Sequence, residues 1–244
     1  MRRFFIDPQT PIVDEIFLPE QESHHLQRVL RLPTGTLLQL LDGQGNIHDA
    51  EIIATGKRVK LRILSSLHVP QDATPLRVSQ SVLKGQKMEL LIQKCTELGV
   101  TEFTPFYSER CQLKKKELSK ITKKYDRWQR IIEEACKQCG TPWAMTLKPL
   151  LSFEEMLQEN VQEVQKILFW EEEGTENSLH SLPLKKEIHG LQVVFGPEGG
   201  FPIEEVTAAK KENFQVLSLG SRILKAETAN IAAVSIVQHL LGNM

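Results

Sequence analysis

Long apolar runs are missing from the sequence: no stretch approaches the roughly 18–20 residues that a membrane-spanning helix needs. An arginine pair lies near the N-terminus, but no long apolar core follows it, so we expect no signal peptide. Cysteine is scarce, with four residues in 244 and no paired framework, which favours a reducing environment. These absences together predict a cytoplasmic protein with no membrane span.

Metal-ligand patterns are also scarce. Cys136 and Cys139 form a lone C-x-x-C, and neither a second pair nor histidines at ligand spacing follow nearby. Because a structural zinc site needs four ligands, we expect no metal, only two thiols near the end of a helix.

Three familiar enzyme signatures are absent. The chain has no G-x-x-x-x-G-K-[ST] loop, which excludes P-loop phosphate transfer, and no G-x-G-x-x-G opening a strand–helix unit. The second absence argues against a dinucleotide fold and against a common Rossmann methyltransferase. No G-x-S-x-G elbow is present, so a serine hydrolase of the α/β type is not expected.

Charge is balanced overall but unevenly distributed. The formal net charge is −1, which argues against a protein that binds polyanions over its whole surface. Residues 110–130 carry nine basic and two acidic groups, whereas residues 151–187 carry nine acidic and three basic groups. The basic segment either docks on a phosphate backbone or is a solvated lysine-rich helix, and the stretch alone leaves both open.

The first 72 residues predict a small β-rich, barrel-like domain. Strand candidates at 3–6, 37–41, 47–54 and 59–64 are separated by turn signals, and the apolar spacing of 22–32 predicts one helix. Residues 69–75 are polar with a proline near each end, which indicates a linker. We therefore place a domain boundary between residues 1–72 and 73–244.

Strand and helix signals alternate in the second domain. Short apolar strands are expected at 76–83, 103–106, 145–150, 167–170, 191–195 and 216–219, which is typical of a parallel sheet buried on both faces. Helices are expected at 88–98, 116–139, 153–157 and 226–241, the last apolar nearly all round and so buried or covered by a partner. The domain is thus α/β, with its ligand site beyond the carboxyl ends of the strands.

Three of those strand ends carry unusual loops, at 169–174, 196–201 and 219–225. The middle one reads Gly196-Pro-Glu-Gly-Gly-Phe201, and its adjacent glycines let main chain approach a ligand and adopt positive φ. A plain structural turn is the alternative for this loop taken alone.

The same loop carries a family resemblance when it is read with the block Leu217-Ser-Leu-Gly-Ser-Arg-Ile-Leu-Lys-Ala-Glu-Thr-Ala229. Together they resemble the S-adenosyl-L-methionine (AdoMet)-binding end of the SPOUT methyltransferases. More narrowly they resemble the RsmE family, which methylates N3 of one uridine in small-subunit ribosomal RNA. Further blocks resemble the family in the same order along the whole chain: 1–5, 24–32, 87–90, 94–100, Pro105 with 108–110, and 127–135.

The resemblance implies a PUA-like RNA-binding β-barrel at residues 1–72 and a SPOUT α/β domain with a deep trefoil knot at residues 73–244. It also implies a homodimer, AdoMet as cofactor, and 16S ribosomal RNA or the small ribosomal subunit as partner. Strand and helix periodicity could not have indicated the knot, because knotted connections are rare. The implied cofactor-binding residues are Leu168, Phe169, Gly196, Pro197, Glu198, Gly199, Gly200, Leu217, Ser218, Leu219, Gly220, Ile223 and Leu224.

For catalysis we favour positioning together with the cations Arg222 and Lys225, which could stabilise a uracil anion as charge develops on its carbonyl oxygens. Glu198 is a candidate general base, although Glu198 and Glu227 could instead fix their loops through hydrogen bonds to backbone N–H groups. N3 lies on the Watson–Crick edge, so the target uridine must be unpaired or flipped out. The residues expected to hold the RNA are Arg2, Arg3, Arg28, Arg31, Lys84, Lys87, Arg110 and Arg127.

Two departures from the family pattern concern the grip on RNA. Thr141 stands where the family has an arginine. Lys225 stands at a second position where the family tends to have an arginine; lysine keeps the positive charge there but cannot form the two parallel hydrogen bonds of a guanidinium group. Three alternatives remain open from the sequence: a SPOUT enzyme with another target, such as a ribose 2′-OH or a transfer-RNA base, a non-catalytic RNA-binding or ribosome-assembly factor, and a scaffold protein.

Overall fold

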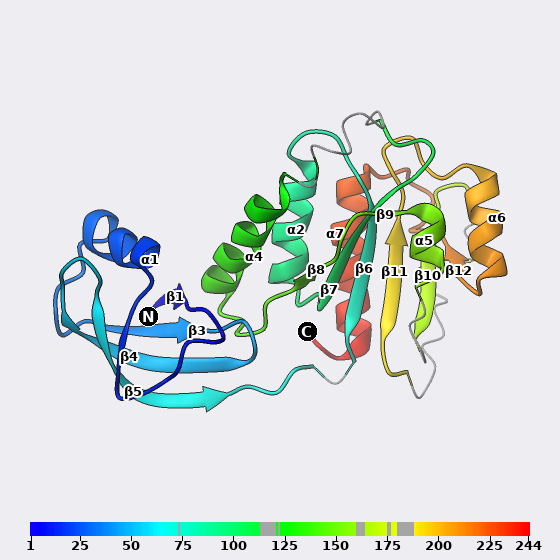
Figure 1. Ribbon diagram of the computed structural model, residues 1–244. Coiled ribbons are helices and arrows are strands. Elements are labelled where there is room, and N and C mark those ends of the chain that lie inside the picture. The colour runs from blue at the N-terminus through cyan, green and yellow to red at the C-terminus, as the bar shows by residue number, and fades with distance from the viewer. Residues whose placement is uncertain (73, 113–120, 122, 160–163, 175–176, 180–187) are drawn as a thin grey trace. The chain divides into compact units, whose positions relative to one another are not determined.

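The computed structural model describes residues 1–72, 74–112, 121, 123–159, 164–174, 177–179 and 188–244 (Figure 1). Parts of the predicted basic segment 110–130, of the helix 116–139 and of the acidic segment 151–187 lie outside these residues. The chain forms two compact units. The N-terminal unit comprises Met1–Gln71 with Glu133–Ala144, and the C-terminal unit comprises Asp72–Ile132 with Met145–Met244.

The N-terminal unit is built on a five-stranded sheet of order β1-β3-β4-β5-β2. Its strands are β1 (Arg2–Phe5), β2 (Glu15–Phe17), β3 (Leu37–Leu41), β4 (Asn46–Ala54) and β5 (Lys60–His68). Only the β1–β3 pair is parallel. Apolar side chains that alternate along these strands share one core with Leu18 and Leu26.

The helical segment that begins at Glu20 differs from the expected single helix. Helix α1 (Glu20–His24) continues directly into a π-helical turn, η1 (His25–Val29). Arg31 follows with a φ of 50°, a left-handed conformation that ends the helical segment. The three-residue edge strand β2 was not expected, because a run of that length has too few residues to show alternation.

The C-terminal unit contains a seven-stranded sheet in which every pairing is parallel. Its order is β12-β10-β11-β6-β7-β8, with β9 also paired to β7. The strands are β6 (Leu76–Ser81), β7 (Glu102–Tyr107), β8 (Thr146–Leu147), β9 (Leu151–Ser152), β10 (Gln165–Phe169), β11 (Leu191–Phe195) and β12 (Gln215–Leu217). The predicted α/β class is confirmed, and the strand expected at 145–150 is divided into β8 and β9.

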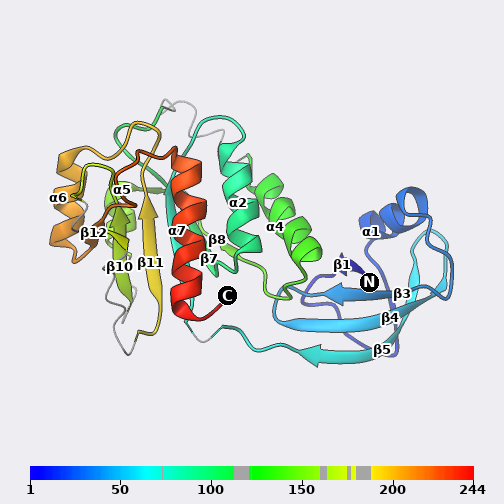
Figure 2. The same cartoon turned by 180° about the vertical axis from the view of Figure 1, so that it is seen from behind.

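Helices cover both faces of this sheet (Figures 1 and 2). Helices α5 (Phe153–Leu157) and α6 (Ile203–Lys211) pack on one face, while α2 (Lys87–Glu97) and α7 (Ala226–Leu241) lie together on the other. Helix α4 spans Tyr125–Cys139. Ser152 caps α5 as expected: its hydroxyl accepts from Glu155 N at 3.1 Å, and the Glu155 carboxylate accepts from Ser152 N at 2.7 Å.

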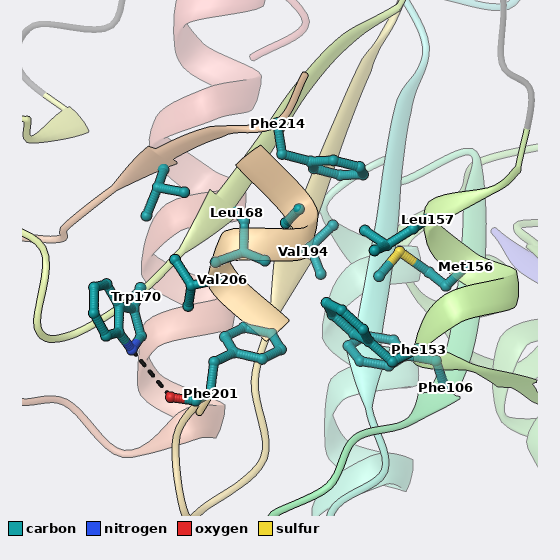
Figure 3. Close-up of a cluster of buried hydrophobic side chains, with 12 residues drawn as sticks. Phe106, Phe153, Met156, Leu157, Leu168, Trp170, Val194, Phe201, Val206 and Phe214 are labelled. Carbon is teal, nitrogen blue, oxygen red and sulfur yellow. Dashed lines mark hydrogen bonds between the residues drawn. The ribbon is translucent and has the colours of Figure 1, made fainter. Parts of the chain in front are cut away.

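A cluster of buried apolar side chains joins α5 and α6 to the sheet (Figure 3). Within it the rings of Phe106, Phe153 and Phe201 pack against one another, with the Phe106 and Phe201 rings parallel at 6.4 Å between centroids. The indole N–H of Trp170 donates to the Phe201 carbonyl at 3.2 Å. This core holds the carboxyl ends of β10 and β11 in place beneath the loops that follow them.

None of the helices that the structure describes combines the length and the apolar character needed to cross a bilayer. Within the same described ranges, no three His, Cys, Asp or Glu side chains converge as metal ligands would.

Candidate functional site

A cavity of about 520 Å³ lies at the carboxyl ends of β10 and β11, beside the start of α7. Its wall is formed by residues 169–171, by 195–200 without Gly199, and by much of 219–229, together with Lys84, Lys87 and Gln112. The strands are parallel and adjacent, so their carboxyl ends meet at one edge of the sheet and bring the three loops together. All three loops singled out in the sequence thus contribute to one cavity.

Gly200 is the glycine in the middle loop whose backbone requires the absence of a side chain. Its φ is +69°, and a Cβ built there would overlap Oε1 of Glu171. Gly199 has a different reason to be small, because a Cβ there would lie 3.1 Å from the Arg110 carbonyl oxygen. The two adjacent glycines therefore accommodate two different neighbours, of which only Gly200 lines the cavity.

Most of the residues expected to bind a cofactor line this cavity. They are Phe169, Gly196, Pro197, Glu198, Gly200, Leu219, Gly220, Ile223 and Leu224.

Leu168, Gly199, Leu217 and Ser218 are not part of the cavity wall. Side chains alternate along a strand, so Leu168 points into the hydrophobic cluster on the face opposite to Phe169. The Leu217 carbonyl accepts from Trp170 N at 3.0 Å, and Ser218 N donates to the Asn177 carbonyl at 2.8 Å. Those main-chain groups are occupied by the protein's own bonds.

The cavity wall includes residues that sequence reasoning did not assign to a cofactor. Phe195 and Phe169 are paired in register at the ends of β11 and β10, and their rings stack at 5.2 Å between centroids. Trp170 and Glu171 come from the charged loop after β10, which sequence analysis noted as unusual without assigning a role. The others are Gln112, Ala226, Glu227 and Ala229.

Lys87 on α2 lies between two carboxylates of the cavity wall. Its Nζ is 3.2 Å from Glu198 Oε1 and 3.4 Å from Glu227 Oε2. The hydrogen bond to Glu198 is the main cause of a raised pKa for Lys87. The backbone N–H of Lys84 donates to the same Glu198 oxygen at 3.1 Å. Glu198 therefore ties the middle loop to the start of α2, and Lys87 ties both to α7.

The second oxygen of Glu198, Oε2, is buried and has no hydrogen-bond partner among the described residues. A buried carboxylate oxygen without a donor is costly, so this atom is suited to accept from a bound molecule.

Three other cations of the cavity wall are exposed and differ from Lys87. The side chains of Lys84, Arg222 and Lys225 make no hydrogen bond or ion pair with any described residue. Ile223, an apolar residue of the same cavity wall, is 83% exposed. An anionic partner that approaches the cavity can therefore contact these cations without first breaking internal ion pairs.

The side chains predicted to hold RNA fall into two groups. Arg3 donates to the Lys137 and Gln138 carbonyls at the end of α4, at 3.1 and 3.3 Å, so it caps a helix inside the N-terminal unit. Arg127 binds Glu89 at 2.6 Å, and Lys87 is engaged in the cluster described above. The exposed members with no such partner among the described residues are Arg2, Arg28, Arg31, Arg110 and Lys84.

A buried carboxylate supports the segment that leads into Gln112 on the cavity wall. Glu205 on α6 accepts from Ser108 Oγ at 2.7 Å and from Glu109 N at 2.9 Å, and it is 8% exposed. Burial raises the pKa of Glu205 above its ordinary value of 4.5.

This shift makes the stability of the protein depend on pH. The buried site favours the protonated form of the Glu205 carboxyl. This preference contributes fully to the free energy of unfolding below the pKa that Glu205 has in the unfolded chain, and the contribution is lost as the pH rises through the pKa of the folded state. Relative to Glu205→Gln, the wild type should therefore lose free energy of unfolding as the pH rises from about 4.5 towards 7. Urea unfolding of both proteins over this range measures the difference. An increase with pH would show instead that the two donors stabilise the charged form.

Comparison with known proteins identifies both parts of the chain. The family described as "RNA methyltransferase domain" matches residues 70–238, and the family described as "RNA methyltransferase PUA domain" matches residues 18–64. A Synechocystis protein named ribosomal RNA small subunit methyltransferase E is 33% identical, and the alignment covers 98% of this chain and 78% of that protein.

Two solved structures cover nearly the whole chain. The ribosomal RNA small subunit methyltransferase E of Neisseria gonorrhoeae, bound to S-adenosyl methionine, is 30% identical with a TM-score of 0.86, covering 98% of each chain. A Legionella pneumophila protein, solved in complex with the bound cofactor SAM, is 31% identical with a TM-score of 0.87, covering 98% of this chain and 97% of that one. The protein belongs to the family of ribosomal RNA small subunit methyltransferase E.

Proposed function

We propose that this protein is an AdoMet-dependent methyltransferase that methylates N3 of one uridine in the 16S ribosomal RNA of the small subunit, in the cytoplasm. The observation that carries the proposal is the cavity at the strand ends, in a chain that belongs to this family. The glycine loop lines this cavity together with cations that have no partner among the described residues. Relatives named for methylation of small-subunit ribosomal RNA, one of them bound to S-adenosyl methionine, support the substrate class and the cofactor.

The residues of the cavity fit AdoMet. A volume of about 520 Å³ is within the range of small-molecule sites. Phe169, Ile223 and Leu224 offer apolar surface for a nucleoside, while the unpartnered Oε2 of Glu198 can accept from a donor such as an amino group. When bound, AdoMet supplies an electrophilic methyl group on its sulfonium.

Arg222 and Lys225 are the residues we propose for the chemical step. N3 of uracil must lose its proton before or during attack, and negative charge then develops on the neighbouring carbonyl oxygens. Two cations that have no hydrogen bond or ion pair with the described residues can stabilise this charge, and such electrostatic stabilisation is the largest single contribution in many enzymes. Glu198 is better suited to anchor the loop than to act as base, because its Oε1 already accepts from Lys84 N and Lys87 Nζ.

The exposed arginines of the N-terminal unit, Arg2, Arg28 and Arg31, are proposed to bind RNA phosphates, with Arg110 and Lys84 doing so on the C-terminal unit. Such contacts position the RNA, while selection of the base depends on entry of a flipped uridine into the cavity. Arg3 and Arg127 are better assigned to internal bonds.

A homodimer and a knotted C-terminal domain complete the proposal. Ile236 and Leu240 on α7 are 46% and 44% exposed, and Leu90 on the adjacent α2 is 40% exposed, which suits a surface covered by a second copy. The position of β10 between β11 and β12 requires a crossover over β10, consistent with the knot that the resemblance implies. Analytical ultracentrifugation tests the dimer, and a monomer at micromolar concentration would contradict it.

Nucleoside analysis of the product tests the proposed reaction. Small-subunit ribosomal RNA from cells that lack the protein should lack one 3-methyluridine, and the purified protein with labelled AdoMet should restore it. A labelled 2′-O-methyl nucleoside would show a different target, and binding of RNA without binding of AdoMet would show a non-catalytic factor.

Lys87→Met should weaken AdoMet binding about fivefold to tenfold, because it removes the cation that joins Glu198 and Glu227. Lys84→Met is the matched control: the Lys84 side chain lines the same cavity but has no partner in the part of the chain that the structure describes, so we expect less than about a twofold change. Titration calorimetry with AdoMet measures both. If the two substitutions changed the Kd for AdoMet equally, or if Lys87→Met bound AdoMet more tightly than the wild type, Lys87 would contribute only its positive charge to the cavity.

A further inference from the structure

A chain of buried polar side chains runs from α2 through α7 and β6 to the cavity loop. The Cys95 thiol donates to Asn230 Oδ1 at 3.5 Å, and Asn230 Nδ2 donates to Gln80 Oε1 at 3.0 Å. Gln80 Nε2 then donates to the Gly196 carbonyl at 3.0 Å and to the Ser81 carbonyl at 2.9 Å. Cys95, Asn230 and Gln80 are each 0% exposed.

The order of donors in this relay leaves one arrangement for both amides. The Gly196 and Ser81 carbonyls can only accept, so Gln80 presents its nitrogen to them and its oxygen to Asn230. Asn230 therefore presents its nitrogen to Gln80 and its oxygen to the Cys95 thiol. Flipping either amide would set oxygen against oxygen or nitrogen against nitrogen, which a fully buried site does not tolerate.

The relay adjoins the cavity wall at two of its members, Gly196 and Asn230. Gly196 is the first residue of the middle loop and lines the cavity. Asn230 immediately follows Ala229, which lines the cavity from α7. The register places Gln80 beside Phe195, the last residue of β11, so its side chain reaches the first carbonyl of the loop. The relay therefore fixes the loop against α7, although none of its three side chains lines the cavity.

We propose that Gln80 and Asn230 are positioning residues that hold the Gly196 carbonyl, and with it loop 196–201, in the conformation that binds AdoMet. The claim that this conformation binds AdoMet rests on the proposed function, whereas the claim that the relay orders the loop does not. Two measurements therefore test the two claims separately.

Gln80→Glu is the variant that tests the relay, because it replaces the donor to Gly196 with an oxygen while keeping size and shape. Gln192→Glu is the matched control. Gln192 lies in the same sheet and is 2% exposed, but its Nε2 donates to Ser79 Oγ at 3.0 Å and does not contact the loop. Both variants bury a carboxyl in one sheet, so both should lose stability.

Hydrogen exchange of the ligand-free protein gives the first readout. At neutral pH the amides of residues 198–201 should exchange at least about tenfold faster in Gln80→Glu than in the wild type. In Gln192→Glu the acceleration of the same amides should be much smaller. Equal acceleration in the two variants would mean a general loss of stability and would overturn the proposal.

AdoMet affinity at two pH values gives the second readout. At about pH 8.5 the introduced carboxylate repels the Gly196 carbonyl, so the Kd of Gln80→Glu should exceed that of the wild type by at least about tenfold. At about pH 6 the buried carboxyl is protonated and can donate, so the ratio should fall towards one. The ionisable groups of the relay and of the cavity wall are Cys95, Lys84, Lys87, Glu171, Glu198, Arg222, Lys225 and Glu227. Because they are the same in both proteins, the wild type measured at the same two pH values is the reference.

A second pair of variants covers the case in which Gln80→Glu fails to fold. Cys95→Ser keeps a donor to Asn230 and should bind AdoMet as the wild type does, whereas Cys95→Ala removes the donor and should bind about threefold to tenfold more weakly. Equal binding by both would overturn the relay. If the wild type itself binds no AdoMet, the proposed function fails, and the exchange result alone decides whether the relay orders the loop.

Discussion

Replacing Arg222 with alanine is expected to lower kcat by about 10²–10³, while the Kd for AdoMet stays within about twofold of the wild-type value. Arg222 lines the cavity and has no internal hydrogen bond or ion pair among the described residues. Its removal should therefore leave the fold intact and withdraw only the charge that we propose acts on the substrate. Because the interaction strengthens as negative charge develops on the uracil, the loss should appear in turnover more than in binding.

Single-turnover methyl transfer to ribosomal RNA at saturating AdoMet measures this effect, and calorimetry gives the cofactor Kd. Arg222→Lys is the graded comparison: it keeps the charge but loses the planar fork, so part of the rate should return. Lys225→Ala should have a smaller or similar effect, since Lys225 lines the same cavity. If Arg222→Ala turned over at the wild-type rate with AdoMet saturating, the assignment of Arg222 to the chemical step would be wrong.

Phe201→Ala should lower the free energy of unfolding of the C-terminal unit by about 3–5 kcal/mol. The ring is 1% exposed and packs against Phe106 and Phe153, so its removal leaves a cavity in the core beneath the loop. Urea unfolding followed by far-ultraviolet circular dichroism measures the change.

Ile203→Ala is the control for the aromatic core. It lies two residues further along, at the start of α6, but is 53% exposed, so truncation should cost less than about 1 kcal/mol. A loss below about 1 kcal/mol for Phe201→Ala would mean that the core collapses around the missing ring and that Phe201 does not support the loop.

The sequence was sufficient to predict the α/β class of the fold and the strand ends at which the cavity lies. Short apolar runs between helical segments indicate a parallel sheet, because only strands covered on both faces can be apolar at every position. The glycine loop 196–201 and the block 217–229 follow such runs, and ligand sites in these sheets lie at the carboxyl ends of strands. Strand placement, capping by Ser152 and the three loops all depend on residues near one another in the chain, which is why local patterns could indicate them.

Only the tertiary structure decided which charged and polar groups are free and which are engaged. Lys87 and Glu198 are 111 positions apart in the chain, and Gln80 and Asn230 are 150 apart, so no local pattern connects them. Arg3 and Arg222 are both arginines near family blocks, yet one caps α4 and the other has no partner among the described residues. Residue type and spacing determine secondary structure and the chemistry that is available. The partner of a long side chain depends on which distant strand ends the fold brings within about 3 Å of it, because hydrogen bonds and ion pairs act only over that range.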